Sequence, residues 1–308
     1  MTKVIRIGTR ESQLAVWQAN QVKDLLATQN IPAELVYIRS EGDIDLKTPL
    51  YEMGVQGIFT RSLDSALLND RIDLAVHSMK DVPVMLPPGI SQAAVMKRAS
   101  YKDLLVHKGN TAFLDDNRSA ALVATSSIRR IAQWKHRYPH HQVENLRGNV
   151  NTRLKKVAES NWQGAIFAAA GLERIGLRPE HSLELDWMLP APAQGAIMVV
   201  CRTGDETLLQ ACTAFNDEAT ATCTSIERDF LRALLGGCST PISALAEVKD
   251  GAVFFQGNIL ATDGSAKAGI EETIPFNQTE NAGAILATAL LANGGQAIAD
   301  AIRPSQKQ

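Results

Sequence analysis

The sequence predicts an α/β protein built from two α/β units of about 100 residues each, followed by a small C-terminal α+β domain. Short apolar runs alternate with helix-prone segments twice along the first two thirds of the chain, and the pattern then changes. Aromatic residues make up only 5% of the sequence, so Ala, Leu, Ile and Val must fill the core, which suits helices that cover a buried sheet. At 308 residues, the chain also exceeds the size at which a single core usually stops growing.

The first unit begins with an apolar run over 4–8, which predicts a strand, and Ser12 is expected to cap a helix over 13–27. The other elements expected in this unit are a strand over 34–38, a polar stretch over 40–57, a helix over 58–68 and a strand over 73–77. This alternation predicts a parallel sheet with right-handed crossovers.

The second unit repeats the alternation after a long connecting stretch. Its expected elements are strands over 121–124, 142–146 and 165–168 and helices over 127–135 and 149–159. A further apolar strand over 196–201 is placed to return to the first unit.

The last third changes character. A long helix is expected over 217–235, then strands over 245–248 and 253–260 around a turn at 249–251, and finally a helix-prone Ala/Leu stretch. We therefore expect domain 1 over 1–97 with 196–215, domain 2 over 98–195 and domain 3 over 216–308.

Charge is distributed unevenly along the chain. The net charge of −2 argues against a polybasic protein and against nucleic acid as a partner. Between residues 118 and 153, however, seven Lys and Arg residues accompany a single acid, Glu144, which gives a local +6 and leaves −8 for the rest. Arginine binds carboxylates and phosphates through paired hydrogen bonds, so this segment suits a small polyanion.

The placement of these cations is more informative than their number. Thr125–Ser127 and Leu146–Asn149 both lie where an expected strand meets an expected helix, and Arg129, Arg130 and Arg147 lie at the same junctions. Ligands of open α/β sheets bind at such strand ends, and a helix N-terminus favours anions. The alternative is a solvated basic face, which two similar junctions make less favourable.

Two loops carry further candidate residues. Lys80 and Asp81 follow an apolar strand, where a carboxylate can stabilise a developing cation or act as acid or base, although an ordinary turn with a surface ion pair is the alternative. His77 is more typical of a core histidine than of a catalyst. Cys238 follows two glycines in a loop and has no evident His partner, so it is a candidate covalent attachment point rather than a protease nucleophile.

The cysteines and the apolar stretches of the sequence indicate the cellular environment of the protein. Cys201, Cys212 and Cys223 lie in apolar or helical runs and are expected to be packing residues, and the cysteines show no metal-ligand spacing. No secretory segment and no uninterrupted apolar stretch of membrane-spanning length is evident, so we expect a cytoplasmic protein without a membrane partner.

Six motifs in this order resemble those of the porphobilinogen deaminase (hydroxymethylbilane synthase) family, from Ile5 to roughly Ala246. They are IGTRES at 7–12, AVHSMKDVP at 75–83, TSSIRR at 125–130, LRGNVNTRL at 146–154, AAGL at 169–172 and GGC at 236–238. Each motif is modestly specific, whereas their joint occurrence in this order is highly specific.

The resemblance implies two periplasmic-binding-protein-like domains with a cleft and a hinge, and a third domain with the cysteine loop. It also implies a dipyrromethane cofactor joined to Cys238 by a thioether, to which four porphobilinogen units are added with loss of ammonia. Water then releases the linear tetrapyrrole hydroxymethylbilane. Each pyrrole carries an acetate and a propionate, which explains the demand for arginine.

The resemblance also implies residue roles. Asp81 matches the catalytic aspartate, which stabilises the electron-poor azafulvene cation left by deamination. Besides Cys238, the implied cofactor-binding residues are Lys80, Ser127, Arg129, Arg130, Arg153 and Gly171. The implied substrate-binding residues are Arg10, Ser12, Gln18, Phe59, Thr125, Arg147 and Gln194. No metal is implied.

Two departures from the family pattern concern the same cleft. Glu52 and Gln56 occupy positions where many relatives have Lys, which should weaken binding of an anionic substrate unless another group compensates. Ala193 replaces a usual Gly and is expected to stiffen the link back to domain 1.

Two other classes of function are alternatives to the transferase that the resemblance implies. An anion-binding receptor of similar fold needs neither Asp81 nor Cys238, and the low aromatic content counts against a nucleic-acid-binding protein. The expected partners are therefore porphobilinogen and, for hand-over of product, uroporphyrinogen-III synthase. We expect a monomer.

Overall fold

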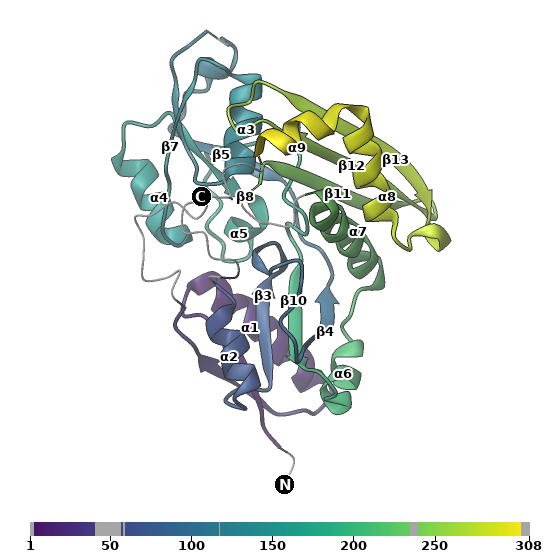
Figure 1. Cartoon of the computed structure of the whole chain (residues 1–308). Coiled ribbons are helices and arrows are strands. Elements are labelled where there is room, and N and C mark those ends of the chain that lie inside the picture. Colours follow the sequence, from purple (N-terminus) through teal and green to yellow (C-terminus); the bar gives the residue numbers. More distant parts are fainter. Residues whose placement is uncertain (1–2, 41–56, 58, 117, 235–239, 303–308) are drawn as a thin grey trace.

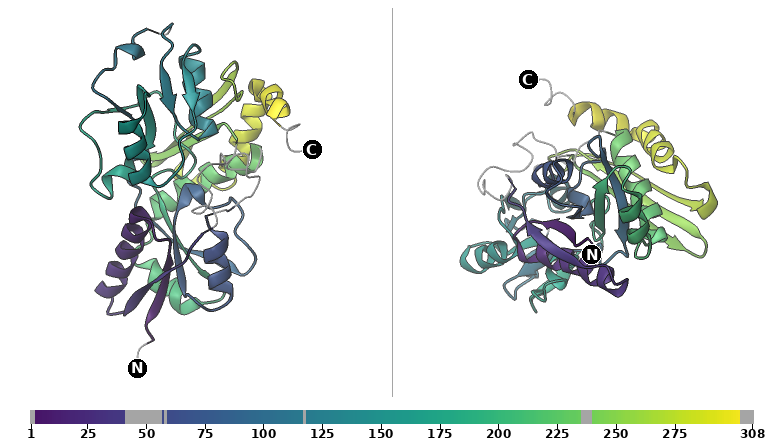
Figure 2. Two further views of the ribbon diagram at one scale, coloured as in Figure 1. Left: turned by 90° about the vertical axis from the view of Figure 1, so that its left-hand side faces the viewer. Right: turned by 90° about the horizontal axis from the view of Figure 1, so that it is seen from below.

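The computed structural model describes residues 3–40, 57, 59–116, 118–234 and 240–302. Three sheets account for the strands of this part of the chain, two of them five-stranded and one three-stranded. In Figure 1 the first sheet forms the lower lobe, the second the upper lobe, and the third lies to their right. The left view in Figure 2 shows the first two lobes one above the other, with the C-terminal helices beside the upper lobe.

The first sheet has the order β2-β1-β3-β10-β4. These strands are β1 (Ile5–Thr9), β2 (Ala33–Tyr37), β3 (Leu74–Ser78), β4 (Ile90–Met96) and β10 (Ile197–Arg202). Helices α1 (Gln13–Thr28) and α6 (Glu206–Thr213) pack on one face, and α2 (Arg61–Leu68) packs on the other. The Ser12 side chain accepts from the N–H of Ala15, so the predicted helix cap is confirmed.

The second sheet has the order β7-β6-β8-β5-β9. Its strands are β5 (Asp103–His107), β6 (Leu122–Ala124), β7 (Gln142–Glu144), β8 (Gly164–Ala168) and β9 (Ser182–Glu184). Helix α3 (Ile128–Arg137) packs on one face, where Trp134 is fully buried. Helices α4 (Val150–Glu159) and α5 (Ala169–Glu173) pack on the opposite face.

The third sheet is antiparallel and joins β11 (Ile242–Lys249), β12 (Ala252–Leu260) and β13 (Lys267–Pro275). Helix α7 (Glu218–Leu234) and the C-terminal helices pack on it through a core that includes Phe230 and Phe255. This confirms the expected small α+β part at the end of the chain.

The C-terminal run Ala282–Ile302 is the one described helical stretch long and apolar enough to cross a membrane by length and composition alone. It is interrupted, because α8 (Ala282–Leu290) and α9 (Gln296–Ile302) are separated by a kink at Leu291–Gly295, where Gly294 has φ +98°. Leu286, Leu290 and Ile298 lie in the core of the third sheet, as expected for a helix that covers a sheet.

The sheets differ from the sequence expectation in the direction of some of their strands. They are mixed rather than parallel: β10 runs antiparallel to β3 and β4, and β5 runs antiparallel to β8 and β9. The antiparallel strands enter because the chain crosses between the two sheets and returns through β10. In addition, the sequence patterns do not predict strands β4, β5, β9 and β13 or helices α5 and α6.

Two chain segments connect the first two sheets, and they lie side by side. The N–H of Ala99 donates to the carbonyl of Gly195 at 3.1 Å, between the segment after β4 and the segment before β10. Ala193 has φ +61°. That left-handed conformation favours Gly, which accounts physically for the residue usual at this position.

Candidate functional site

The predicted catalytic loop follows β3 directly. A short 3₁₀ turn at Met79–Asp81 buries Met79 and leaves the Asp81 carboxylate exposed. Arg228 of α7 donates to the carbonyls of Val82 and Pro83 at 3.0 and 2.6 Å, which fixes the loop against the third part of the chain. The loop therefore presents Asp81 from a braced backbone.

Lys80 lies beside Asp81 and is partly buried. Its Nζ donates to Oε1 of Gln194 at 3.3 Å. Burial lowers the pKa of Lys80 to about 8, and the nearby Asp81 carboxylate opposes this effect only partly. Lys80 is therefore a cation whose charge is sensitive to pH near neutrality.

Arg129 and Arg130 lie in the first turn of α3 and share one buried carboxylate, Asp103 at the start of β5. Nη2 of Arg129 lies 2.8 Å from Asp103 Oδ2, and Nη2 of Arg130 lies 2.6 Å from Oδ1. The two arginines hold the pKa of Asp103 below its usual range although burial alone would raise it. Asp103 thus offsets cations that would otherwise oppose the dipole of α3.

Arg153 on α4 faces the same region. Its Nε donates to the carbonyl of Gly148 at 2.7 Å. Burial, with Arg130, Arg147 and Arg10 nearby, lowers the pKa of Arg153 to about 10, while Asp81 opposes the shift. Residues of both sheets therefore share one electrostatic environment, with an excess of positive charge.

Arg10 comes from the turn between β1 and α1. Its guanidinium carbon lies 4.3 Å from the centre of the Phe59 ring, a cation–π arrangement that orients the charge. Burial and the nearby Arg10 charge lower the pKa of His77 to about 4, so His77 is neutral at physiological pH. His77 is buried, as expected for a core histidine.

The uncharged candidates are mostly engaged with protein groups. Gln18 donates to Oγ of Ser78 at 2.9 Å, and Oγ1 of Thr125 accepts from the N–H of Ser127 at 3.3 Å. Gln194 is fully buried and donates to Tyr101 and Asp103. At Gly171 of α5, a Cβ would lie 3.8 Å from Leu14 of α1, so the first two parts of the chain are close there.

Cys238 lies outside the described residues, as do Glu52 and Gln56. The other three cysteines are buried, which confirms that they are packing residues. Burial raises the thiol pKa to about 11 for Cys201 and Cys223 and to about 12 for Cys212, so these thiols stay protonated and unreactive. Across the ranges that the structure describes, no cluster of three or more His, Cys, Asp or Glu could hold a metal ion.

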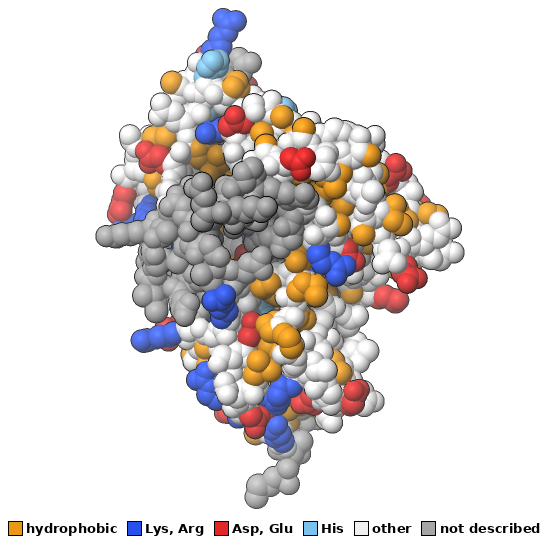
Figure 3. Space-filling model, in the orientation of Figure 1, with side chains coloured by type: hydrophobic (Ala, Val, Ile, Leu, Met, Phe, Trp, Pro, Cys, Tyr) orange, Lys and Arg blue, Asp and Glu red, His pale blue; other side chains and the backbone are white. Residues whose placement is uncertain are grey.

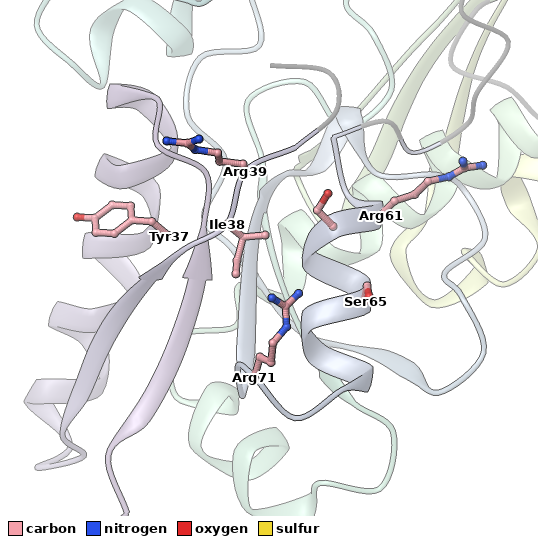
Figure 4. A pocket seen from close by; sticks show the side chains of 7 residues that line it. Tyr37, Ile38, Arg39, Arg61, Ser65 and Arg71 are labelled. Atoms are coloured by element: carbon pink, nitrogen blue, oxygen red, sulfur yellow. The ribbon is translucent and has the colours of Figure 1, made fainter. Parts of the chain in front are cut away.

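A hollow of about 450 Å³ lies beside the end of β2 and helix α2. Arg39, Arg61 and Arg71 line it, but Figure 4 shows their guanidinium groups pointing in different directions rather than at one point. On the face in Figure 3, Lys and Arg side chains of the lower lobe are interspersed with Asp and Glu. None of the cations near Asp81 and Asp103 lines this hollow.

Sequence comparison identifies the family. A model described as "Porphobilinogen deaminase, dipyromethane cofactor binding domain" matches residues 5–210, and the C-terminal domain of porphobilinogen deaminase matches 221–292. The chain belongs to the porphobilinogen deaminase family. It is therefore a transferase of tetrapyrrole biosynthesis that uses a dipyrromethane cofactor, as the motifs predicted.

Individual relatives agree with this assignment. The porphobilinogen deaminase of Syntrophomonas wolfei is 41% identical over 298 residues, which cover 96% of this chain and 97% of that protein. The enzymes of Syntrophotalea carbinolica and Pelobacter propionicus are 40% and 39% identical, covering 98% and 97% of this chain and 96% and 97% of theirs.

Solved structures also match part of this chain. An ancestral cationic amino acid solute binding protein has a TM-score of 0.44 and 14% identity, over 69% of this chain and 87% of its own. The VFT2 domain of Bordetella pertussis BvgS has a TM-score of 0.42 and 12% identity, over 71% and 91%. We infer the two-lobed α/β architecture from the sheets described above.

The residues present fit the dipyrromethane cofactor of this family. Its two pyrroles carry four carboxylates. Two carboxylates of the region, Asp81 and Asp103, are outnumbered by six cations, which leaves four positive charges for the carboxylates of cofactor and substrate together; the cations are Lys80, Arg10, Arg129, Arg130, Arg147 and Arg153. In addition, Nε of Arg129 is buried without a hydrogen-bond partner in the described part of the chain. A buried donor of this kind is costly unless a ligand satisfies it.

Asp103 is the member of this charged region that the sequence reasoning missed. It lies outside every recognised motif, directly before the apolar run Leu104–Val106. The available signal was that a carboxylate beside a buried strand must be paired, and arginines are the partners it needs.

Proposed function

We propose that porphobilinogen is deaminated and coupled at the cation cluster around Asp81, with Cys238 as the attachment point of the dipyrromethane. One observation carries this proposal: Lys80 and Asp81 of the first sheet share an electrostatic environment with Arg129, Arg130 and Arg153 of the second. A polycarboxylate that grows by pyrrole units needs several cations and an exposed acid in one place. These residues supply both, because Asp81 is exposed and forms no ion pair within the described part of the chain.

In the proposed site, the cations divide between cofactor and substrate. Lys80, Arg129, Arg130 and Arg153 would hold the cofactor carboxylates, and Arg10 and Arg147 those of the incoming unit. Ser12, Gln18, Phe59, Thr125, Ser127, Gly171 and Gln194 would support these contacts. The close placement of Arg10 and Phe59 favours such a role, because the ring holds the guanidinium in one orientation.

Asp81 is assigned the catalytic role because it combines exposure with a positive surrounding. Loss of ammonia leaves positive charge on the substrate pyrrole, and a fixed carboxylate near the pyrrole N–H stabilises that charge. The bonds from Arg228 hold the loop in place, so little reorganisation is needed when charge develops. The cofactor, when bound, supplies the pyrrole end to which each unit is added.

The domain organisation belongs to the same proposal. We assign domain 1 to 1–97 with 196–215, domain 2 to 98–195 and domain 3 to 216–308, so that the two connecting segments between the first two sheets act as a hinge. The pairing of β10 with β3 and β4 supports returning 196–215 to domain 1. A monomer that works in the cytoplasm and hands its unstable product to uroporphyrinogen-III synthase completes the proposal.

Intact mass tests the attachment point. The purified protein should weigh more than its sequence by two pyrrole units, and Cys238→Ala should abolish the addition. Cys201→Ala is the matched control, because this buried thiol stays protonated and should leave the addition in place. An unmodified protein with full turnover of porphobilinogen would sink the proposal.

Asp81→Ala tests the catalytic assignment. The exposed carboxylate contributes little to packing, so the variant should unfold at nearly the same temperature as the wild type. Its turnover of porphobilinogen should fall at least 100-fold, the scale on which a preorganised electrostatic group contributes. Normal turnover would remove Asp81 from the mechanism.

A further inference from the structure

We infer that Asp103 is a positioning residue for the cofactor and substrate carboxylates, acting through Arg129, Arg130 and Lys80. The inference rests on the proposed function, since it assumes that these cations bind the pyrrole carboxylates. Asp103 itself is fully buried, so we assign it no direct contact with a ligand.

The carboxylate of Asp103 fixes both arginines at once. It accepts from Nη2 of Arg129 at 2.8 Å and from Nε and Nη2 of Arg130 at 3.2 and 2.6 Å. Two backbone carbonyls complete the arrangement, because Leu189 accepts from Arg129 at 2.8 Å and Ile166 accepts from Arg130 at 2.9 Å. Each guanidinium is planar with five N–H donors, so these bonds set which of its donors remain for a ligand.

The same carboxylate reaches the catalytic loop through one intermediary. Gln194 donates to Oδ1 of Asp103 at 2.9 Å, and Oε1 of its side chain accepts from Lys80 at 3.3 Å. An amide that bridges a carboxylate and an ammonium is fixed in one orientation, with its NH₂ toward the acid. Asp103 therefore orients cations on both sides of the region, from α3 and from the loop after β3.

Stability alone does not explain such a group. A buried ion pair pays a large desolvation cost, and well-packed apolar residues can replace it without loss of stability. Its geometric effect is different. Mutation of residues that orient metal ligands typically costs 10- to 100-fold in affinity or activity, and we expect the same scale for a residue that orients arginines. We therefore assign Asp103 the role of orienting the cations of the site.

The chain offers a matched control in Asp73. This residue is equally buried, binds Arg6, Arg202 and Lys3, and its pKa also lies below the usual range. It precedes β3, whereas the catalytic loop follows β3, so it lies at the opposite end of that strand. Asp73→Asn should cost a similar amount of stability without touching the charged region.

The test compares Asp103→Asn, Asp103→Glu and Asp73→Asn with the wild type. We expect kcat/KM for porphobilinogen to fall about 10- to 100-fold in Asp103→Asn, less in Asp103→Glu, and not in Asp73→Asn at temperatures where all are folded. A second readout is independent of turnover: the fraction of purified protein that carries the added mass of the dipyrromethane should fall in Asp103→Asn and stay complete in Asp73→Asn.

A double-mutant comparison separates positioning from direct action. The part of the loss that Asp103 causes through the arginines should disappear when Arg129 and Arg130 are already Ala, so Asp103→Asn should then lower kcat/KM by a smaller factor, which measures the remaining route through Gln194 and Lys80. Unchanged kcat/KM and full cofactor content in Asp103→Asn would overturn the inference, and if that variant fails to fold, the same result in Asp103→Glu would do so. Absence of turnover in the wild type would instead overturn the proposed function.

Discussion

Arg98 and Glu227 form a buried two-point ion pair between the segment that follows β4 and helix α7. Nη1 of Arg98 lies 2.6 Å from Oε1 of Glu227, and Nη2 lies 3.0 Å from Oε2. Glu227 also accepts from the N–H groups of Ala193 and Ala246 at 2.6 and 2.7 Å, and Nε of Arg98 donates to the carbonyl of Gln194. One carboxylate therefore ties both segments that connect the first two sheets to the third part of the chain.

Breaking this pair should be strongly destabilising. Glu227→Gln leaves Arg98 buried without its counter-charge, which we expect to cost about 3–5 kcal/mol in the free energy of unfolding. Glu173→Gln is the control, because both side chains of its pair with Arg178 are 36% exposed and the pair should contribute less than about 1 kcal/mol. Denaturant unfolding of both variants measures the difference. A loss in Glu227→Gln no larger than that in Glu173→Gln would contradict the bracing role.

A second prediction about the connecting segments concerns the replacement of Gly195. It has φ +88°, and a Cβ there would lie 2.7 Å from the carbonyl of Ala99 and 2.8 Å from that of Ser100. Gly195→Ala must therefore push the two segments apart or distort the backbone, since neither neighbour is a flexible side chain.

The matched control is Gly204→Ala. Gly204 has φ +84°, but a Cβ there meets nothing within 4 Å. Both variants should pay about 1–2 kcal/mol for the left-handed conformation, and Gly195→Ala should lose appreciably more because of the added clash. Thermal unfolding of the two variants measures this excess. Equal melting temperatures would mean that the segments can separate without cost.

Much of the fold followed from sequence, but not the pairing of distant segments. Apolar runs predicted β1, β3, β6, β8 and β10 to within a few residues, because buried strands in α/β sheets are nearly continuous in hydrophobicity. The apolar runs did not predict strand β5, because it begins with the charged residue Asp103 and because its neighbours β8 and β9 lie far along the chain.

The candidate site was likewise predicted in its local positions but not in its contacts between distant segments. The motif positions of Lys80, Asp81 and Arg129 placed them at strand ends, as ligand sites in α/β sheets require. That Arg129 and Arg130 share a buried carboxylate could not be read from sequence, because Asp103 precedes them by 26 and 27 residues on another element. The sequence showed an excess of charge, whereas the structure shows which part of it is compensated.

His77 provides a prediction about acid stability. Its pKa is about 4 in the folded protein against 6.5 for the ordinary value, because burial and Arg10 disfavour the charged form. The unfolded chain therefore binds more protons between pH 6.5 and 4, so stability is present above pH 6.5 and is lost as the pH falls toward 4. This shift in pKa corresponds to a contribution of about 3 kcal/mol to the free energy of unfolding above pH 6.5. His77→Gln should flatten the stability profile in this window, as measured by denaturant unfolding at several pH values, and an unchanged slope would rule His77 out as its cause.

Lys80 provides a prediction about alkaline activity. Because burial lowers its pKa to about 8, Lys80 loses its charge as the pH rises through 8 and beyond, and the site then holds one cation fewer. We expect kcat/KM for porphobilinogen to decline over this range, since this quantity reports ionisation of the free enzyme. In Lys80→Arg the guanidinium stays protonated, so the alkaline decline should move to higher pH even if the maximal rate is lower. Titration of the substrate is common to both proteins, so the difference between their profiles isolates Lys80. Superimposable profiles from pH 7 to 9.5 would show that another group controls the alkaline limb.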